Sequence, residues 1–148
     1  MSAIKHCHDA GISHRDIKMD NILVNEDGQL KIIDFGFAVK RSEPSELISN
    51  FCGTPSFMCP EILKRSPYDP HKADIWALGV LLYKLCTDRY PFRAESDGEL
   101  SALIIKGEVK YDKVACEKLK ALLIGMLRKN EAERLSVDDV LQSEWLRA

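Results

Sequence analysis

The longest apolar stretch of the chain runs from Asp74 to Thr87, and its apolar side chains fall on nearly every side of a helix. These residues are Ile75, Trp76, Ala77, Leu78, Val80, Leu81, Leu82 and Leu85. A helix that is apolar all round is buried within its domain. The pattern therefore predicts a central buried helix. We expect Asp74 to lie at its start, where a carboxylate can cap the helix or favour its dipole.

Apolar residues at helical spacing predict further helices toward the C-terminus. Residues 99–106 form a short amphipathic pattern, and a second apolar stripe runs through residues 116–128. Ser136 with Asp139 three residues later has the form of a helix N-cap with an acidic residue at N3, a weaker capping box. The apolar positions of this last helix are Val140, Leu141, Trp145 and Leu146. These stripes are typical of core packing.

The N-terminal third has a different pattern. Residues 1–10 predict a helix, whereas residues 22–24 and 30–33 are short β-runs on either side of an Asn-Glu-Asp-Gly turn, which is a hairpin signal. Residues 34–61 then form a long irregular segment, and a loop of that length within a compact domain is unusual unless it is functional. The predicted fold class is therefore mainly α, a helical bundle with one small β-hairpin.

Composition places the chain among ordinary globular proteins. Its 148 residues are 45% hydrophobic and 30% charged, and we treat residues 1–148 as one domain. The net charge is −2, so no bulk attraction to nucleic acid or anionic lipid is expected. The longest apolar run, 75–83, is far shorter than the ~20 residues of a membrane span. We expect neither a nucleic-acid nor a membrane partner.

Cysteine usage favours a reducing compartment. The five cysteines, at positions 7, 52, 59, 86 and 116, include no Cys-x-x-Cys pair. An odd count without such a pair predicts reduced thiols and an intracellular protein, cytoplasmic or nuclear. The His6-Cys7-His8 triplet could ligate a metal, but no second ligand pair follows, so we favour the end of a helix.

The candidate chemistry lies around the hairpin. Residues 14–21 read His-Arg-Asp-Ile-Lys-Met-Asp-Asn, and an Asp-Phe-Gly triplet begins at Asp34. Phosphoryl transfer needs a carboxylate that orients the attacking hydroxyl, oxygen ligands for Mg²⁺ and a cation near the transferred group. Asp16 can be the first, Asn21 and Asp34 the second, and Lys18 the third. The hairpin should return Asp34 beside Asn21; the alternative is a polar hairpin with solvated charges.

Three later motifs extend this pattern. Residues 53–61 resemble the Gly-Thr-Pro to Ala-Pro-Glu segment of protein kinases, and 74–79 resemble the opening of the family's central helix. Arg134 stands where the family places the partner of the Pro-Glu glutamate, here Glu61. From about residue 3 onward the chain is similar to the C-terminal lobe (C-lobe) of a eukaryotic-type kinase. Lys18 and Gly-Thr-Pro indicate the serine/threonine branch, close to calcium/calmodulin-dependent or AMP-activated kinases.

The resemblance implies a set of residue roles. ATP and Mg²⁺ would be the cofactors, and the partner would be a protein with a serine or threonine acceptor. Leu23 would lie under the adenine, or equally be a strand core residue, and Asp74 would tether the backbone near His14. The resemblance implies Asp16 and Lys18 for catalysis, and Lys18, Asn21 and Asp34 for ATP. It implies Asn21 and Asp34 for the metal, and Thr54 as a hydrogen-bond partner of Asp16 and Lys18.

The sequence leaves two interpretations of regulation open. The resemblance makes residues 34–61 the activation segment, with Arg15 able to grip a phosphate on it. The usual phosphothreonine position is Asn50, which cannot be phosphorylated. Either Ser49 takes over, or the segment is set without phosphate through neutral hydrogen bonds, which we favour. The alternative role of Arg15 is a local salt bridge.

Half of a kinase active site is missing from these residues. Thirteen residues precede His14, with one glycine, Gly11. They cannot supply the Gly-rich loop, strand lysine and helix glutamate that an N-terminal lobe (N-lobe) places over ATP. We expect either a C-lobe fragment of an ATP-dependent kinase, inactive without an N-lobe or an association partner, or a non-catalytic binding or decoy module.

Overall fold

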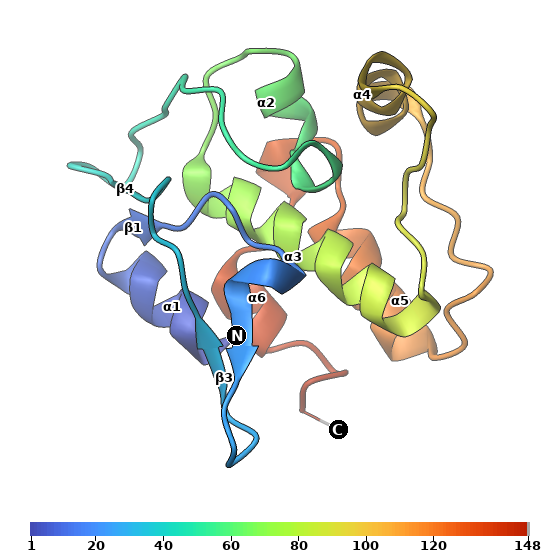
Figure 1. Ribbon diagram of the computed structural model, residues 1–148, viewed down its shortest axis with the longest axis horizontal. Coiled ribbons are helices and arrows are strands. Elements are labelled where there is room, and N and C mark those ends of the chain that lie inside the picture. Colours follow the sequence, from blue (N-terminus) through green and yellow to red (C-terminus); the bar gives the residue numbers. More distant parts are fainter. Residues whose placement is uncertain (148) are drawn as a thin grey trace.

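The computed structural model describes residues 1–147 and is mainly helical (Figure 1). The helices are α1 (Ser2–Asp9), α2 (Pro60–Leu63), α3 (Pro70–Thr87), α4 (Asp97–Lys106), α5 (Glu117–Met126) and α6 (Val137–Leu141). The strands are β1 (Ile12–Ser13), β2 (Ile22–Val24), β3 (Leu30–Ile32) and β4 (Val39–Lys40). Short 3₁₀ turns cover η1 (Met19–Asn21), η2 (Pro55–Phe57) and η3 (Glu131–Glu133). The predicted fold class, a kinase-like C-lobe with a small hairpin, is confirmed.

Helix α3 is the central element, as its all-round apolar pattern predicted (Figure 1). Trp76 and Val80 are fully buried within it, and Gly79 lets α5 come close. A Cβ at Gly79 would stand 3.0 Å from side-chain atoms of Met126 and Leu127. The apolar face of α5 therefore packs directly on the backbone of α3.

The predicted start of α3 is wrong. The helix begins four residues earlier, and its N-cap is Asp69, whose carboxylate accepts a 2.8 Å hydrogen bond from the backbone N–H of His71. Pro70 suits the first helical position because its fixed φ fits the helix and its missing N–H would have no intrahelical partner there. Asp74 therefore lies in the second turn, 1% exposed, and does not cap the helix.

Two small antiparallel sheets lie beside the helices. Strands β2 and β3 form the predicted hairpin, with Ile22 opposite Ile32, and Gly28 takes a positive φ of 75° in the turn. Leu23 is 52% exposed, so its interpretation as a strand core residue is wrong. The second sheet, β1 with β4, was not predicted; it places the start of the 34–61 segment beside the loop that carries Asp16.

The C-terminal elements agree with their patterns, with one difference. Ser136 and Asp139 form a reciprocal capping box, so the predicted cap is confirmed. Helix α6 ends at Leu141, whereas the apolar pattern extended it to Leu146; Trp145 lies beyond the helix and still packs against the core. Within residues 1–147, no helix is both long and apolar enough to cross a membrane.

Candidate active site

Asp74 anchors the loop that follows β1. Its carboxylate accepts hydrogen bonds from the backbone N–H groups of His14, at 2.9 Å, and Arg15, at 2.8 Å. The Nε2–H of His8 donates a third bond, also at 2.9 Å, from α1. A buried carboxylate needs such partners. The tether that the resemblance implied is therefore present, and it fixes two successive peptide groups of the loop.

The loop is further held by its own histidine. Arg15 takes a positive φ of 68°, which is uncommon for a residue with a side chain. The His14 ring accepts from the backbone N–H of Asp16 at 3.2 Å and, through its other nitrogen, donates to the carbonyl of Ile33 at 2.9 Å. It also packs edge-on against Phe35, with ring centroids 4.8 Å apart. These contacts hold the backbone turn that directs Asp16 into the site.

The carboxylate of Asp16 is surrounded by donors. The Thr54 hydroxyl donates to Oδ1 at 2.9 Å, while Lys18 Nζ lies 2.9 Å and Asn21 Nδ2 3.1 Å from Oδ2. Burial acts to raise the pKa of Asp16, but the hydrogen bonds from Lys18 and Thr54 outweigh it and hold the pKa below its usual range. The same pair raises the pKa of Lys18. Asp16 is therefore an ionised acceptor at neutral pH.

The hairpin brings together two residues, Asn21 and Asp34, whose side-chain oxygens could ligate a metal ion. The backbone N–H of Ile33 donates to the carbonyl of Asn21 at 3.0 Å, so Asp34 follows directly beside Asn21, as the spacing predicted. Asn21 uses its Nδ2 group on the backbone carbonyl and the carboxylate of Asp16, so its amide oxygen is not used in these bonds. Asp34 is exposed, with a positive φ of 61°, and one carboxylate oxygen accepts from the N–H of Gly36. Carboxylate and amide oxygens suit Mg²⁺.

The Arg15 side chain connects this loop to the 34–61 segment. Its Nε donates to the carbonyl of Phe37 at 2.7 Å, and its Nη1 lies 3.5 Å from the Tyr68 hydroxyl. That hydroxyl donates to the carbonyl of Asn50 at 3.0 Å. Within residues 1–147 Arg15 forms no ion pair, so the alternative of a local salt bridge is wrong. Ser49 is exposed, outside these contacts.

Arg134 and Glu61 form the ion pair that the resemblance implied. One guanidinium nitrogen lies 2.9 and 3.1 Å from the two carboxylate oxygens. The same guanidinium donates to the carbonyls of Arg128 and Lys72 and lies over the Trp76 ring at 5.1 Å. The Arg134 side chain has no exposed surface. It therefore joins the end of the 34–61 segment to α3 and η3.

Comparison with known proteins gives one consistent family. The sequence model described as "Protein kinase domain" matches residues 1–146. The chain belongs to the protein kinase family. It is 37% identical over 149 residues to "CBL-interacting protein kinase 12" of Oryza sativa subsp. japonica, 38% over 145 to "Serine/threonine-protein kinase kin-29" of Caenorhabditis briggsae and 40% over 146 to "Sperm motility kinase 3A" of Mus musculus.

These relatives confirm the serine/threonine branch, close to calcium/calmodulin-dependent or AMP-activated kinases. The matches cover 98–99% of this kinase chain. They cover only 28%, 18% and 29% of the three relatives, so the chain spans less than a third of their length.

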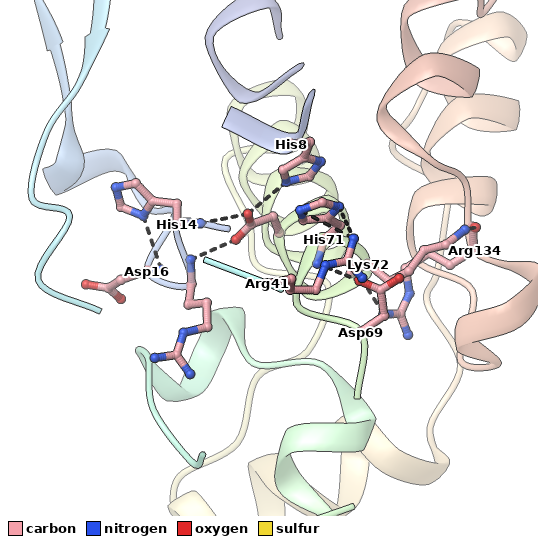
Figure 2. Close-up of polar contacts among 10 residues, drawn as sticks. His8, His14, Asp16, Arg41, Asp69, His71, Lys72 and Arg134 are labelled. Carbon is pink, nitrogen blue, oxygen red and sulfur yellow. Dashed lines mark hydrogen bonds and ion pairs between the residues drawn. The ribbon is translucent and has the colours of Figure 1, made fainter. Parts of the chain in front are cut away.

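Sequence reasoning missed a stack of histidines behind the loop that carries Asp16 (Figure 2). The rings of His8 and His71 stack with centroids 4.0 Å apart and an interplanar angle of 12°. Arg41 Nη1 donates to Asp69 at 3.1 Å, and its Nη2 contacts the His71 ring. His8 is therefore buried against Asp74 and helps to hold the loop through that carboxylate. Within residues 1–147, no three His, Cys, Asp or Glu side chains are grouped to hold a metal ion.

The stack predicts a pH-dependent stability. Burial lowers the pKa of His71 from 6.5 to about 4, and the neighbouring His8 and Arg41 act in the same direction. Between these values the unfolded chain binds a proton at His71 that the folded kinase does not. The contribution of the neutral His71 to the free energy of unfolding is therefore fully present above pH 6.5 and is lost as the pH falls toward 4. We expect His71→Gln to remove this part of the pH dependence.

Urea unfolding of the wild type and His71→Gln between pH 6.5 and pH 4 measures the effect. The difference in free energy of unfolding between the two proteins should shrink as the pH falls, since all other titrating groups are common to both. An unchanged difference across this range would contradict the role of His71.

Breaking the Glu61–Arg134 pair should destabilise the chain strongly. Arg134→Met leaves the Glu61 carboxylate and two backbone carbonyls without their donor, and breaking such a buried pair costs about 3–5 kcal/mol. Lys118→Met is the matched control, because Lys118 is half-exposed and lies 3.8 Å from an exposed Glu144. Exposed pairs contribute about 0–1 kcal/mol. Equal losses in the two variants, measured by urea unfolding, would overturn this assignment.

Proposed function

We propose that this chain is the catalytic C-lobe of an ATP-dependent kinase that phosphorylates serine or threonine residues of proteins. The observation that carries the proposal is the surroundings of Asp16. Its ionised carboxylate lies between Lys18, Thr54 and Asn21, and the hairpin bond from Ile33 to Asn21 brings Asp34 beside Asn21. Phosphoryl transfer depends on positioning and electrostatics, and this arrangement offers both.

Asp16 would orient the acceptor hydroxyl and accept its proton. Because hydrogen bonds hold the pKa of Asp16 low, the carboxylate is ready as an acceptor at neutral pH. Lys18, 3.0 Å from the Thr54 hydroxyl and 2.9 Å from Asp16, would place its charge beside the transferred phosphoryl group. Thr54 thereby ties the end of the 34–61 segment to both residues.

Asn21 and Asp34 would hold Mg²⁺ through their side-chain oxygens. When bound, the ion would neutralise charge on the ATP phosphates. Leu23, half-exposed on β2, would provide apolar contact for the adenine. The Gly-rich loop, strand lysine and helix glutamate of the nucleotide site would come from an N-lobe.

Residues 34–61 would act as the activation segment. Arg15 reaches the Tyr68 hydroxyl, which in turn holds the carbonyl of Asn50. These contacts hold the segment without a phosphate group, which supports activation without phosphorylation. The exposed Ser49 is the alternative phosphate acceptor. The five cysteines are free, which supports a reducing compartment, the cytoplasm or the nucleus.

Fusion to an N-lobe tests the proposal. The part of the rice relative that precedes its matched region would be joined to Met1, and phosphate transfer from radiolabelled ATP to a serine peptide library would be measured. We expect Mg²⁺-dependent transfer. The rice kinase with its own C-lobe is the control; if it is active while the fusion binds Mg-ATP but transfers nothing, the proposal is wrong.

A further inference from the structure

A basin of about 1210 Å³ lies away from the Asp16 carboxylate, at the C-terminal end of α3. Its walls are the connection from α3 to α4 and the connection from α4 to α5, which run along one edge of the molecule in Figure 1. The Tyr83 hydroxyl joins the walls by donating to the carbonyl of Lys110 at 2.7 Å. We call this hollow the basic basin. It has no part in the site described above.

The basin is lined by basic side chains that form no ion pair within residues 1–147. Five basic residues line it: Lys84, Arg89, Arg93, Lys110 and Lys113. Three carboxylates accompany them: Asp88, Glu108 and Asp112. In the described part of the chain none of the five cations forms an ion pair. The surface is therefore locally positive on a chain whose net charge is −2.

Lys84 is the best-placed of these cations. It belongs to α3, is partly buried, and its Nζ lies 4.6 Å from the centre of the Tyr90 ring. The ring and the helix restrict its side chain, so its charge is held at one place instead of moving freely in solvent. A restrained, unpaired ammonium group attracts an incoming carboxylate at a lower entropic cost than a free lysine does.

A packed aromatic pair links the basin to the segment that carries Thr54. Thr54, bonded to Asp16 at 2.9 Å, is followed three residues later by Phe57. The Phe57 ring packs edge-on against Tyr90 with centroids 5.8 Å apart, and Tyr90 carries Lys84 on its face. An extended peptide advances about 3.3 Å per residue. A substrate that runs from Asp16 past Phe57 and Tyr90 would bring residues beside its acceptor to the basin.

We propose that the basic basin binds acidic residues beside the acceptor serine or threonine of a protein substrate. Charge complementarity decides the occupant, since five unpaired cations favour a peptide rich in glutamate or aspartate and disfavour a basic one. This inference rests on the proposed function for the role of the peptide as substrate, but the binding itself needs only the 148-residue chain. Lys84 and Arg89 are the specificity-determining residues.

Fluorescence anisotropy with the intact 148-residue chain tests the proposal. The probes are three labelled peptides with one central serine, flanked by glutamates, by glutamines or by lysines. We expect the glutamate peptide to bind about tenfold more tightly than the glutamine peptide, because several modest exposed pairs act together. The preference should weaken as salt rises, since exposed charges are screened over about 8 Å at physiological ionic strength.

Variants locate the binding site. Lys84→Gln with Arg89→Gln should abolish the preference, whereas Lys84→Arg, which keeps the charge, should retain it. Lys31→Gln with Lys40→Gln is the matched control, because both lysines are exposed and lie outside the basin. Circular dichroism checks that each variant is folded. Equal binding of the glutamate and glutamine peptides, or equal loss of preference in the two double variants, overturns the proposal.

Comparison of peptide binding with phosphate transfer separates this inference from the proposed function. Peptide binding without phosphate transfer in the N-lobe fusion would reject the kinase assignment and keep the basin as an acidic-peptide site. Transfer with no preference for acidic peptides would reject the basin proposal alone.

Discussion

Asp16→Asn is expected to lower kcat of the N-lobe fusion by about 10²–10⁴-fold, with a much smaller change in KM. An amide cannot take the proton of the acceptor hydroxyl, and it removes the charge that pairs with Lys18 at 2.9 Å. The substitution keeps the size of the side chain and the acceptor for the Thr54 hydroxyl, so the loop should stay folded. Steady-state transfer to a serine peptide is the measurement.

Asp20→Asn is the matched control for this prediction. Asp20 lies four residues away in η1 and is exposed, so it is the same chemical change outside the contacts of Asp16. Its kcat should stay within a few-fold of the wild type, in line with a solvated surface charge. Near-normal turnover in Asp16→Asn would show that the resemblance assigns the proton acceptor wrongly.

The 148-residue chain by itself is expected to transfer no measurable phosphate. Asp34, Phe35 and Leu23 are exposed on the face where an N-lobe would cover the nucleotide, with 47% of Phe35 and 52% of Leu23 accessible. Water would reach the transferred group, and the phosphates would lack half of their contacts. Positioning alone supplies about 7–11 kcal/mol of a barrier reduction, so its loss removes many orders of magnitude in rate.

The measurement compares the purified chain with its Asp16→Asn variant, using radiolabelled ATP and the glutamate-flanked serine peptide. The variant is the blank for any contaminating kinase. Robust transfer by the wild-type chain that disappears in the variant would contradict the prediction. It would mean that the described half of the site is sufficient for catalysis.

Local chemistry was enough to predict several elements. The Asn-Glu-Asp-Gly turn predicted the hairpin because such residues tolerate the backbone of a tight turn, and Gly28 does take a positive φ. Ser136 and Asp139 predicted a cap because their partners lie within one turn of the same helix. Helix α3 was recognisable because an all-round apolar pattern has no other stable place than the core.

The start of α3 and the exposure of Leu23 could not be predicted in this way. An acidic residue at the beginning of an apolar run fits a cap equally well whether it is Asp69 or Asp74. The choice depends on His14 and Arg15, some sixty residues earlier, whose N–H groups take the Asp74 carboxylate. The pattern of a strand does not indicate whether other elements cover the outer face of a two-stranded sheet. An apolar residue such as Leu23 can therefore be mistaken for a core residue.

The sequence by itself determined the family, the fold class and the residues around Asp16, because each is written in local motifs and apolar periodicity. Only the tertiary structure decided the contacts between distant residues that no motif marks. It stacked His8 on His71 behind the loop and gathered Lys84 and Lys110 into one basin. The physical reason is that contacts between residues far apart in sequence follow from how the helices pack around α3, and no local pattern records that packing.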